Sequence, residues 1–561
     1  MVRNSNNIIE ILFEHFATLA TAPDGIARLR ELILQLAVQG KLGTNNPTEL
    51  PLKIDESKKR IRKTKSQKGN SNKIQIIDIF PLDSIPKNWK KTILDSVGVW
   101  STGGTPSRRE VTYFDGDVPW IKSGDLNDSI VTKTDETISQ SGLDNSNAKL
   151  LPKGTISIAL YGATIGKLGI LGIEAATNQA CANCVINEKI IISRYLFYFL
   201  RSQRNYLIQV GQGGAQPNIT NWIIWEWPIV IPPLAEQHRI VTKVDRMMAL
   251  SDEIEARLQQ ERAGCLKLGT ASLAGLQNAE NPEEFGRQWA QVCDAFEMIL
   301  DCPENVAVLR QTILQLAVQG RLVPQEPGDQ PAGKLVERIR KEKERLVKEG
   351  KATRDKRLEP ITREDIKQNI PPNWALTRLG EIAEYNAERK ISSNEISEDS
   401  WVFDLEDIEK DTSRILQKVR YKDRQSLSTK SKFKKGDILY GKLRPYLNKV
   451  VVADDDGYCT TEIVPIRPYL DIDPKYLMYA LKTPDFLAYV NSKTYGIKMP
   501  RLGTVDAINT IIPLPPLAEQ HRIVAKVDAL MALCDALEAR LKERSTVQGR
   551  LAGAVVKQVA G

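Results

Sequence analysis

The sequence predicts an α+β protein in which two mixed α/β domains, related by pseudo-twofold symmetry, are separated by long repeated helices forming an antiparallel coiled coil. The main observation is an internal repeat, in which PPLAEQHRIVTKVDRMMALSDEIEARL at 232–258 returns as PPLAEQHRIVAKVDALMALCDALEARL at 515–541. Pro232 and Pro515 lie 283 residues apart in a chain of 561 residues. The period is therefore half of the chain, and each half should form one structural unit.

Apolar residues within each repeated segment predict the seam of a two-helix coiled coil, because they alternate at steps of four and three. Ser251 interrupts the first seam, which otherwise consists of Ile240, Val244, Met247, Ile254 and Leu258. The second seam consists of Ile523, Val527, Leu530, Cys534, Leu537 and Leu541. The simplest partner for each seam is the other copy. A helix from Leu234 to about Leu276 would be on the order of 60 Å long.

The remaining elements also occur twice. A helix capped by Asp24 should run through GIARLRELILQLAVQGKL to about Gly40, and its twin covers 308–322. An Ile-Pro-x-Asn-Trp segment follows in each half, ending at Trp89 and Trp374. Short β-rich runs at 155–162 and 437–441 come next, and short helices are expected at 193–203 and 474–482. Each half is thus predicted to hold one mixed α/β domain bracketed by long helices.

These patterns divide the chain into five regions. An N-terminal helical region covers 1–50, and the first mixed domain with its basic connector covers 51–231. A central repeated helical region covers 232–325. The second mixed domain with its connector covers 326–514, and a C-terminal repeated helix covers 515–561.

Charge is concentrated in two blocks of a chain whose formal net charge is only +8. Nine Lys and Arg face two acids in 53–73, and eleven face five in 334–357. Such blocks are often solvated connectors, and a phosphate backbone is a common partner when they bind. The seven scattered cysteines predict reduced thiols. With no apolar run of 18 residues and no secretory leader, a cytoplasmic protein without a membrane segment is expected.

Catalytic and metal sites are not predicted. Two of the three histidines, His238 and His521, occupy the same place in the repeat, which indicates a structural role or a subunit contact. Cys181 and Cys184 lack a second pair of zinc ligands. The GATIGK segment at 162–167 has three residues between its glycines where a P-loop needs four. The chain is therefore expected not to be an enzyme and to bind no cofactor itself.

The paired PPLAEQHRIV and ILQLAVQG helices, with two variable domains between them, resemble the specificity subunit of type I restriction-modification systems. TGGTPSRR at 102–109 and YFDGDVPWIKSGDL at 113–126 are similar to the usual opening of the family's target recognition domains. The resemblance implies that each variable domain binds one half of a split, asymmetric DNA sequence. It also implies two modification subunits that use S-adenosylmethionine, and restriction subunits that use ATP and Mg²⁺.

Candidate DNA-binding residues lie on glycine-bounded loops of the two domains. GKLRPYLNK at 441–449 combines phosphate-pairing cations with a guanine-capable Arg and an adenine-capable Asn. The candidates in the second domain are Lys442, Arg444, Tyr446, Asn448, Lys449, Lys498 and Arg501. Those in the first domain are Thr105, Ser107, Arg108, Arg109, Lys122, Ser123, Tyr161, Thr164, Lys167, Gln216 and Asn218. Trp89, Trp120 and Trp374 are expected in the core.

Candidate docking residues for the modification subunits lie in the repeated helix openings. They are Glu236, Gln237, His238, Arg239, Glu519, Gln520, His521 and Arg522. The alternative is that both openings serve only the internal helix bundle. Two other functions also stay open, namely a specificity subunit of a related bifunctional system, or a coiled-coil scaffold that binds no DNA.

Overall fold

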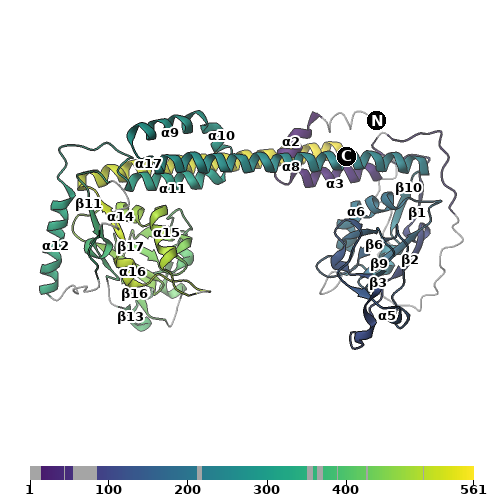
Figure 1. Cartoon of the computed structure of the whole chain (residues 1–561), viewed down its shortest axis with the longest axis horizontal. Helices are drawn as coiled ribbons and strands as arrows, with labels where there is room; N and C mark the ends of the chain where they lie inside the picture. The colour runs from purple at the N-terminus through teal and green to yellow at the C-terminus, as the bar shows by residue number, and fades with distance from the viewer. Residues whose placement is uncertain are drawn as a thin grey trace. The chain divides into compact units, whose positions relative to one another are not determined.

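The structure, a computed structural model, describes residues 14–42, 44–54, 85–211, 218–349, 358–362, 370–387, 390–424, 428–496 and 498–560. It divides into two compact units. Unit 1 comprises Met1–Gln260 and Arg544–Gly561, and unit 2 comprises Glu261–Glu543. Two long helices, α8 (Leu234–Asn278) and α17 (Leu517–Ala560), therefore contribute residues to both units (Figure 1).

The two long helices confirm the helical prediction for both copies of the repeat. Each begins two residues after the first proline of a Pro-Pro pair. Proline ends the preceding strand and has no backbone N–H of its own to leave unpaired at the helix start. Glu236 and Glu519 lie in the first turns, near the positive end of each helix dipole. The helices contain 45 and 44 residues without interruption.

The apolar stripes of the two copies are buried in separate cores. Ile240, Val244 and Met247 belong to the core of unit 1, together with Ala552, Val555 and Val559 near the end of α17. In unit 2, Ile523 and Val527 share a core with α11. The expectation that the two copies pair with each other is therefore wrong for these residues, because each stripe is buried within its own unit.

The shorter repeated helices are α3 (Gly25–Val38) in unit 1 and α11 (Glu304–Val318) in unit 2. Both end before a glycine with positive φ, at +70° for Gly40 and +69° for Gly320. A Cβ on Gly40 would lie 2.7 Å from the ring of Pro86, and one on Gly320 would lie 2.4 Å from Pro371. Glycine therefore permits both the turn and the contact with the Ile-Pro-x-Asn-Trp segment. Asp24 precedes α3 with a φ of +55° and no side-chain capping bond, so the predicted cap is wrong.

Unit 1 contains a five-stranded sheet, a three-stranded sheet and a two-stranded pair among its described residues. The first has the order β2 (Gly98–Thr102), β9 (Cys181–Ile186), β6 (Ile156–Ala159), β7 (Leu168–Leu171) and β4 (Ser129–Val131). The second is β5 (Thr137–Ile138), β3 (Phe114–Ile121) and β8 (Ala176–Thr177). The pair is β1 (Lys90–Ile93) with β10 (Pro228–Ile231). The accompanying helices are α2 (Phe16–Thr21), α5 (Gln140–Asp144), α6 (Ser193–Val210) and α7 (Asn221–Trp225).

Unit 2 follows the same plan with a different outer sheet. One sheet has the order β12 (Ala383–Tyr385), β20 (Ile463–Pro468), β17 (Ile438–Gly441) and β18 (Val450–Val452). The other is β13 (Lys390–Ile391), β16 (Lys430–Phe433), β19 (Gly457–Thr460), β14 (Trp401–Phe403) and β15 (Val419–Arg420). The pair is β11 (Ala375–Arg378) with β21 (Ile511–Leu514). Its further helices are α9 (Pro282–Asp294), α10 (Phe296–Leu300), α12 (Ala332–Lys348), α13 (Leu379–Ile382), α14 (Pro474–Ala480), α15 (Pro484–Lys493) and α16 (Thr504–Ile508).

The predicted strands and short helices lie where they were expected. The runs at 155–162 and 437–441 contain β6 and β17, and the segments at 193 and 474 begin α6 and α14. Trp89, Trp120 and Trp374 are buried, as predicted. No helix in the described ranges is apolar enough over a sufficient length to cross a membrane. The first basic block falls largely outside the described residues. Residues 334–348 of the second lie in α12, and 350–357 lie outside the described residues.

Candidate nucleic-acid interface

Each variable domain is closed at its base by an antiparallel strand pair. β1 pairs with β10 so that Lys90 lies opposite Ile231, and β11 pairs with β21 so that Ala375 lies opposite Leu514. Since β10 leads into α8 and β21 leads into α17, the start and end of each domain meet at the first turn of a long helix. The long helix therefore supports its domain through this strand pair.

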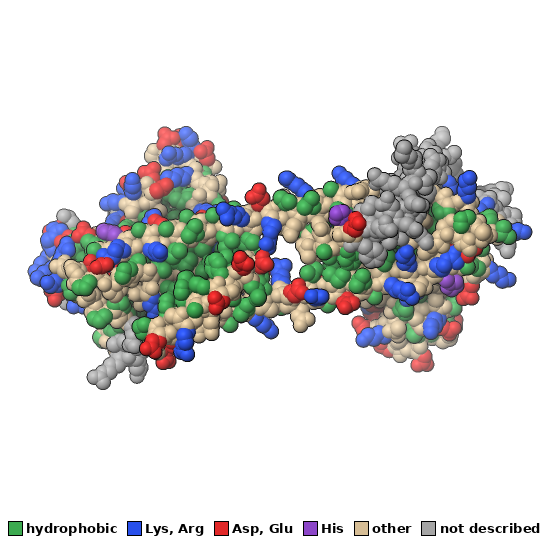
Figure 2. Space-filling model, turned by 90° about the horizontal axis from the view of Figure 1, so that it is seen from above, with side chains coloured by type: hydrophobic (Ala, Val, Ile, Leu, Met, Phe, Trp, Pro, Cys, Tyr) green, Lys and Arg blue, Asp and Glu red, His purple; other side chains and the backbone are tan. Residues whose placement is uncertain are grey.

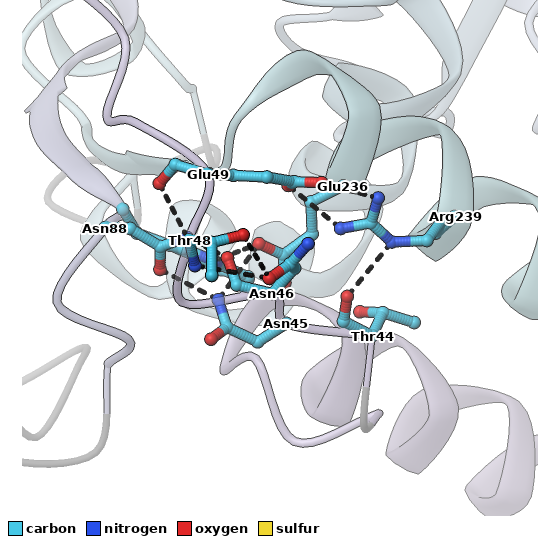
Figure 3. A network of polar contacts seen from close by, with 9 residues as sticks. Thr44, Asn45, Asn46, Thr48, Glu49, Asn88, Glu236 and Arg239 are labelled. Carbon is cyan, nitrogen blue, oxygen red and sulfur yellow. Dashed lines mark hydrogen bonds and ion pairs between the residues drawn. The ribbon is translucent and has the colours of Figure 1, made fainter.

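The PPLAEQHR opening of α8 fastens that base through buried polar contacts (Figure 3). Trp89 donates its indole N–H to the Glu236 carboxylate at 3.0 Å, and Asn45 donates to the same oxygen at 3.0 Å. Arg239 pairs with Glu49 at 2.8 Å. The glutamate is 0% exposed, so these donors replace the lost hydration of one oxygen, whereas its other oxygen has no hydrogen-bond partner among the described residues.

Unit 2 builds the same anchor from its own copy of the motif. Trp374 donates its indole N–H to Glu519 at 2.9 Å, and Gln325 donates to the other carboxylate oxygen at 2.5 Å. Arg522 pairs with Asp329. We call each of these contact sets a polar anchor, which is centred on Glu236 in unit 1 and on Glu519 in unit 2.

The glutamine that follows each anchor glutamate is also used internally. Gln237 accepts a hydrogen bond from the backbone N–H of Ile192 at 3.0 Å and donates to the Pro232 carbonyl at 3.0 Å. Gln520 accepts from the N–H of Asp473 at 3.0 Å and donates to the Pro515 carbonyl at 3.0 Å.

The predicted docking role of four motif residues therefore needs correction. Glu236, Gln237, Glu519 and Gln520 are at most 1% exposed and their contacts lie inside their own units. His238 and His521 are exposed, and His521 lies 3.9 Å from Asp473. Arg239 and Arg522 reach the surface, but each is paired with an acid of its own unit. The structure thus favours the alternative in which these openings serve the internal packing.

Burial changes the acidity of the anchor glutamates. Desolvation raises the pKa of Glu236 above its ordinary value of 4.5, while the hydrogen bonds from Trp89 and Asn45 oppose that shift. Desolvation likewise raises the pKa of Glu519, against the bonds from Trp374 and Gln325. In both units burial is the larger effect, so the proton is held more tightly in the folded chain.

In unit 2, the turn between β17 and β18 carries most of the candidate residues of that domain. Arg444 lies on the surface with a φ of +49°, just before the short 3₁₀ turn η10 (Pro445–Leu447). No described acidic side chain pairs with Arg444. Tyr446 is 49% exposed and Lys442 is half-buried. This turn therefore presents an unpaired guanidinium next to an aromatic ring.

A second loop, residues 495–502, lies against that turn. The Arg444 N–H donates to the Pro500 carbonyl at 2.8 Å, and Leu443 forms an isolated β-bridge with Arg501. Lys498 is exposed on this loop, and Tyr495 is 61% exposed. Lys442, Arg444, Tyr446 and Lys498 therefore lie on two loops held together by backbone hydrogen bonds, which we call the unit 2 loop pair.

Three candidates of unit 2 are placed differently from the expectation. Asn448 is 1% exposed, so its amide cannot reach a base edge in this conformation. Lys449 donates to the Leu405 carbonyl at 2.7 Å. Arg501 pairs with Glu462 at 2.8 Å, and that hydrogen bond lowers the pKa of Glu462 below 4.5. The positive charge of Arg501 is thus largely balanced within the unit.

In unit 1, the TGGTPSRR segment is fixed to its own domain by two glycines. A Cβ on Gly103 would lie 2.1 Å from the Asn178 carbonyl oxygen, and one on Gly104 would lie 2.1 Å from the Ala148 nitrogen. The indole N–H of Trp120 donates to the Gly104 carbonyl at 3.0 Å. The glycines therefore allow the close approach that positions the exposed side chains that follow, which are Thr105, Ser107, Arg108 and Arg109.

Glu136 balances two of the predicted cations of unit 1. Arg108 pairs with it at 2.8 Å and Lys122 at 2.6 Å. The hydrogen bond from Lys122, followed by that from Arg108, lowers the pKa of Glu136 below 4.5. The guanidinium of Arg108 also lies 4.4 Å from the centre of the Phe114 ring. Ser123 is half-buried in the turn that follows Lys122.

The turn between β6 and β7 brings four further candidates toward one another. Tyr161 forms an isolated β-bridge with Asn218, and both side chains are exposed. Lys167 is exposed at the end of the turn, and Thr164 is half-buried within it. Gln216 lies outside the described residues.

The acids that balance these cations could not be identified from the sequence. Glu136 lies 28 residues after Arg108, and Glu462 lies 39 residues before Arg501, with no local spacing to link them. Tyr495 was also missed, although its position beside GIKMPR at 496–501 was a usable signal. Cys181 and Cys184 are buried on β9, where burial raises the pKa of Cys181 to about 12. No group of three or more metal-ligating side chains occurs within the described ranges.

Two mixed domains, each fastened to a copy of the same helix and each presenting polar loops, define a duplicated nucleic-acid-recognition protein. The family model described as "Type I restriction modification DNA specificity domain" matches residues 86–261 and 371–544. The chain belongs to this family and carries its domain twice, once in each unit.

Relatives of similar length support that assignment. The specificity subunit of the type I restriction enzyme EcoAI from Escherichia coli is 27% identical, over 95% of this chain and 93% of the relative. That of EcoEI, also from Escherichia coli, is 28% identical over the same shares. A solved structure from a study of the assembly and conformational transition of a type I R-M system matches with a TM-score of 0.50 and 17% identity. It covers 85% of this chain and 98% of that one, and at this identity it supports the fold alone.

Proposed function

We propose that this chain is the non-catalytic DNA-specificity subunit of a type I restriction-modification assembly. Each variable domain binds one half of a bipartite, asymmetric DNA site. Catalysis belongs to the partners, which are two modification subunits that use S-adenosylmethionine and restriction subunits that use ATP and Mg²⁺. The chain itself needs no bound cofactor for this role.

One observation carries the proposal: the same turn is built twice with different side chains. β6 lies between β9 and β7, and β17 lies between β20 and β18, with antiparallel pairing throughout. In each unit the turn after that central strand forms a β-bridge to the segment before a short helix. Unit 1 presents Tyr161 and Lys167 there, and unit 2 presents Arg444 and Tyr446.

The chemistry of the two turns suits different half-sites. A guanidinium can donate two hydrogen bonds to the major-groove edge of guanine, whereas an ammonium and a hydroxyl favour phosphate and single-bond contacts. Similar scaffolds with dissimilar contact groups therefore predict an asymmetric target. Under this proposal the long helices set the unread spacer between the half-sites, because a helix of 45 residues is on the order of 68 Å long.

Methylome sequencing of the host with and without the gene tests the proposal. We expect one methylated motif with two dissimilar halves and a fixed spacer to disappear when the gene is deleted, and to return with the intact gene. A methylome that does not change on deletion would contradict the proposal. An absence of specific DNA binding by the chain with the modification subunit present would instead support the scaffold alternative.

A further inference from the structure

Unit 2 carries a helical segment, α9 and α10, that the proposed DNA-binding surfaces do not use. Its inner face is apolar, with Val292 and Ile299 buried against Leu273 and Leu276 of α8 and with Phe285 packed beside them. Within unit 2, the segment lies on the side of α8 away from the strands (Figure 1). It is therefore remote from the unit 2 loop pair.

The segment is held firmly at its start. Asn281 caps α9 by accepting a hydrogen bond from the Glu284 N–H at 2.9 Å. Arg321 donates to the Ala279 carbonyl at 2.6 Å, and its guanidinium lies 6.0 Å from the centre of the Phe285 ring. The outer face of the segment is thus a defined surface.

The segment exposes three large apolar side chains outside that buried face. Trp289 is 52% exposed, Phe296 44% and Met298 60%. Cys293 is exposed one helical turn after Trp289, on the same side of α9. Figure 2 looks onto this side of unit 2 and shows hydrophobic side chains with both acidic and basic side chains among them. Exposed tryptophan, phenylalanine and methionine are enriched at protein interfaces.

The charge around these exposed side chains indicates which kind of partner can bind there. Residues 280–304 contain seven acids, Glu280, Glu283, Glu284, Asp294, Glu297, Asp301 and Glu304, and one cation, Arg287. Because Arg262 of α8 pairs with Glu304, six acids and one cation remain, a balance of −5 in a chain whose net charge is +8. Such a surface repels the DNA phosphates and also repels a second copy of itself. It favours a protein surface with an apolar centre and a rim of Lys and Arg.

The sequence repeat supplies an independent observation. Subtracting 280 from Trp289, Cys293 and Phe296 gives Ile9, Phe13 and Phe16, which are all apolar. The same offset relates Ile299 to Leu19. The duplication therefore repeats the apolar positions of Trp289, Cys293 and Phe296, whereas Met298 corresponds to Thr18.

We propose that the exposed surface of α9 and α10, which carries Trp289, Phe296 and Met298, docks one modification subunit. This inference rests on the proposed function, and it assigns docking to a surface other than the buried PPLAEQHR openings. The contact on the modification subunit is an apolar patch bordered by basic side chains.

Native mass spectrometry of the full chain, co-expressed with its modification subunit, tests the inference. Two variants probe the apolar and charged parts of the surface separately, namely Trp289→Ser with Met298→Ser, and Asp294→Lys with Glu297→Lys. All four side chains are exposed, so both variants should fold. Each is expected to weaken binding of one modification subunit by about tenfold or more, so that the complex holds one fewer. Binding by the wild-type chain should also weaken as salt is raised.

Trp222→Ser is the matched control, because Trp222 is 54% exposed on α7 of unit 1 without this acidic surrounding, and it should bind the modification subunits normally. If both α9–α10 variants keep the full complement, the inference is wrong. A wild-type chain that dimerises alone through Trp289 would also overturn it. If the wild-type chain binds no modification subunit at all, the proposed function itself fails, which is a separate result.

Discussion

Trp89 donates its indole N–H to the fully buried carboxylate of Glu236, which lies 147 residues later in the chain. This contact ties the start of the first variable domain to the helix that follows its end. Trp374 and Glu519 repeat the contact across 145 residues. An internal duplication has therefore preserved a buried hydrogen bond between a domain and its support, which makes the contact a direct target for mutation.

Glu236→Ala should destabilise unit 1. It leaves the buried Trp89 indole without its acceptor, at a cost of about 1–3 kcal/mol, while the Asn45 amide keeps its second acceptor, Asn88. Glu236→Gln is the matched variant, because its amide oxygen can still accept, and we expect a smaller loss. Urea unfolding of the full chain measures both. Equal losses of stability in the two variants would show that the hydrogen-bond acceptor at residue 236 does not account for the destabilisation.

The pH dependence of stability should distinguish Glu236→Gln from the wild type. Burial raises the folded-state pKa of Glu236 above 4.5, so the folded chain holds a proton that the unfolded chain releases. The resulting contribution is fully present below the unfolded pKa and is lost as pH rises through the folded pKa. The glutamine variant has no such contribution to lose. Its stability relative to wild type should therefore increase as pH rises through that window, measured by urea unfolding at several pH values. A relative stability that falls over the same window would reverse the assigned shift.

The paired helices, the β-rich runs and the buried tryptophans could all be predicted, because each depends on local periodicity or on the repeat itself. The structural role of the repeated polar residues could not be predicted. Glu236 and Gln237 recur as Glu519 and Gln520 whether they face a partner or the interior, and only tertiary packing decides between those roles.

Asn448 shows the same limit for a loop. A φ of +51° turns its side chain inward, where neither amide atom has a hydrogen-bond partner among the described residues. The amino-acid composition of its loop was the only reason to predict that Asn448 reads a base. The positive charge that Arg108 and Arg501 offer to DNA was likewise overestimated from the sequence, because the acids that pair with them are distant in the sequence.

Glu136→Gln should raise non-specific DNA affinity, because it frees Arg108 and Lys122 from the acid they share. If both cations then reach phosphates, the slope of log K against log salt becomes steeper by about 0.9 for each contact. Fluorescence anisotropy with a random duplex at several salt concentrations measures the slope. The control is Glu381→Gln, which frees Arg340 of α12 in unit 2. An unchanged slope would place Arg108 and Lys122 away from the DNA.

Arg444→Ala should weaken binding to the specific site by about 1–3 kcal/mol, or roughly 5- to 150-fold, and relax one position of one half-site. Arg444 is exposed and unpaired among the described residues, so the change removes no internal ion pair. Arg345→Ala is the matched control, since Arg345 is paired with Glu342 and Glu349 on α12. A binding selection with the complete complex reads both affinity and sequence preference. A uniform loss on all sequences would make Arg444 a phosphate contact.

Inserting one heptad after Leu258 in α8 and another after Leu541 in α17 should lengthen the spacer without altering either half-site. These points adjoin the boundary between the units, at Gln260 and Glu543, so neither core is interrupted. Seven residues add roughly 10 Å of helix while nearly preserving the apolar register, and that length corresponds to about 3 base pairs. The insertion in α8 alone is the control, because it lengthens one helix against an unchanged one and should impair folding or binding. The methylated motif of cells that express the double insertion measures the spacer directly. An unchanged spacer would exclude helix length as the determinant of the spacer. Altered half-sites would show that the insertion had disturbed the domains themselves.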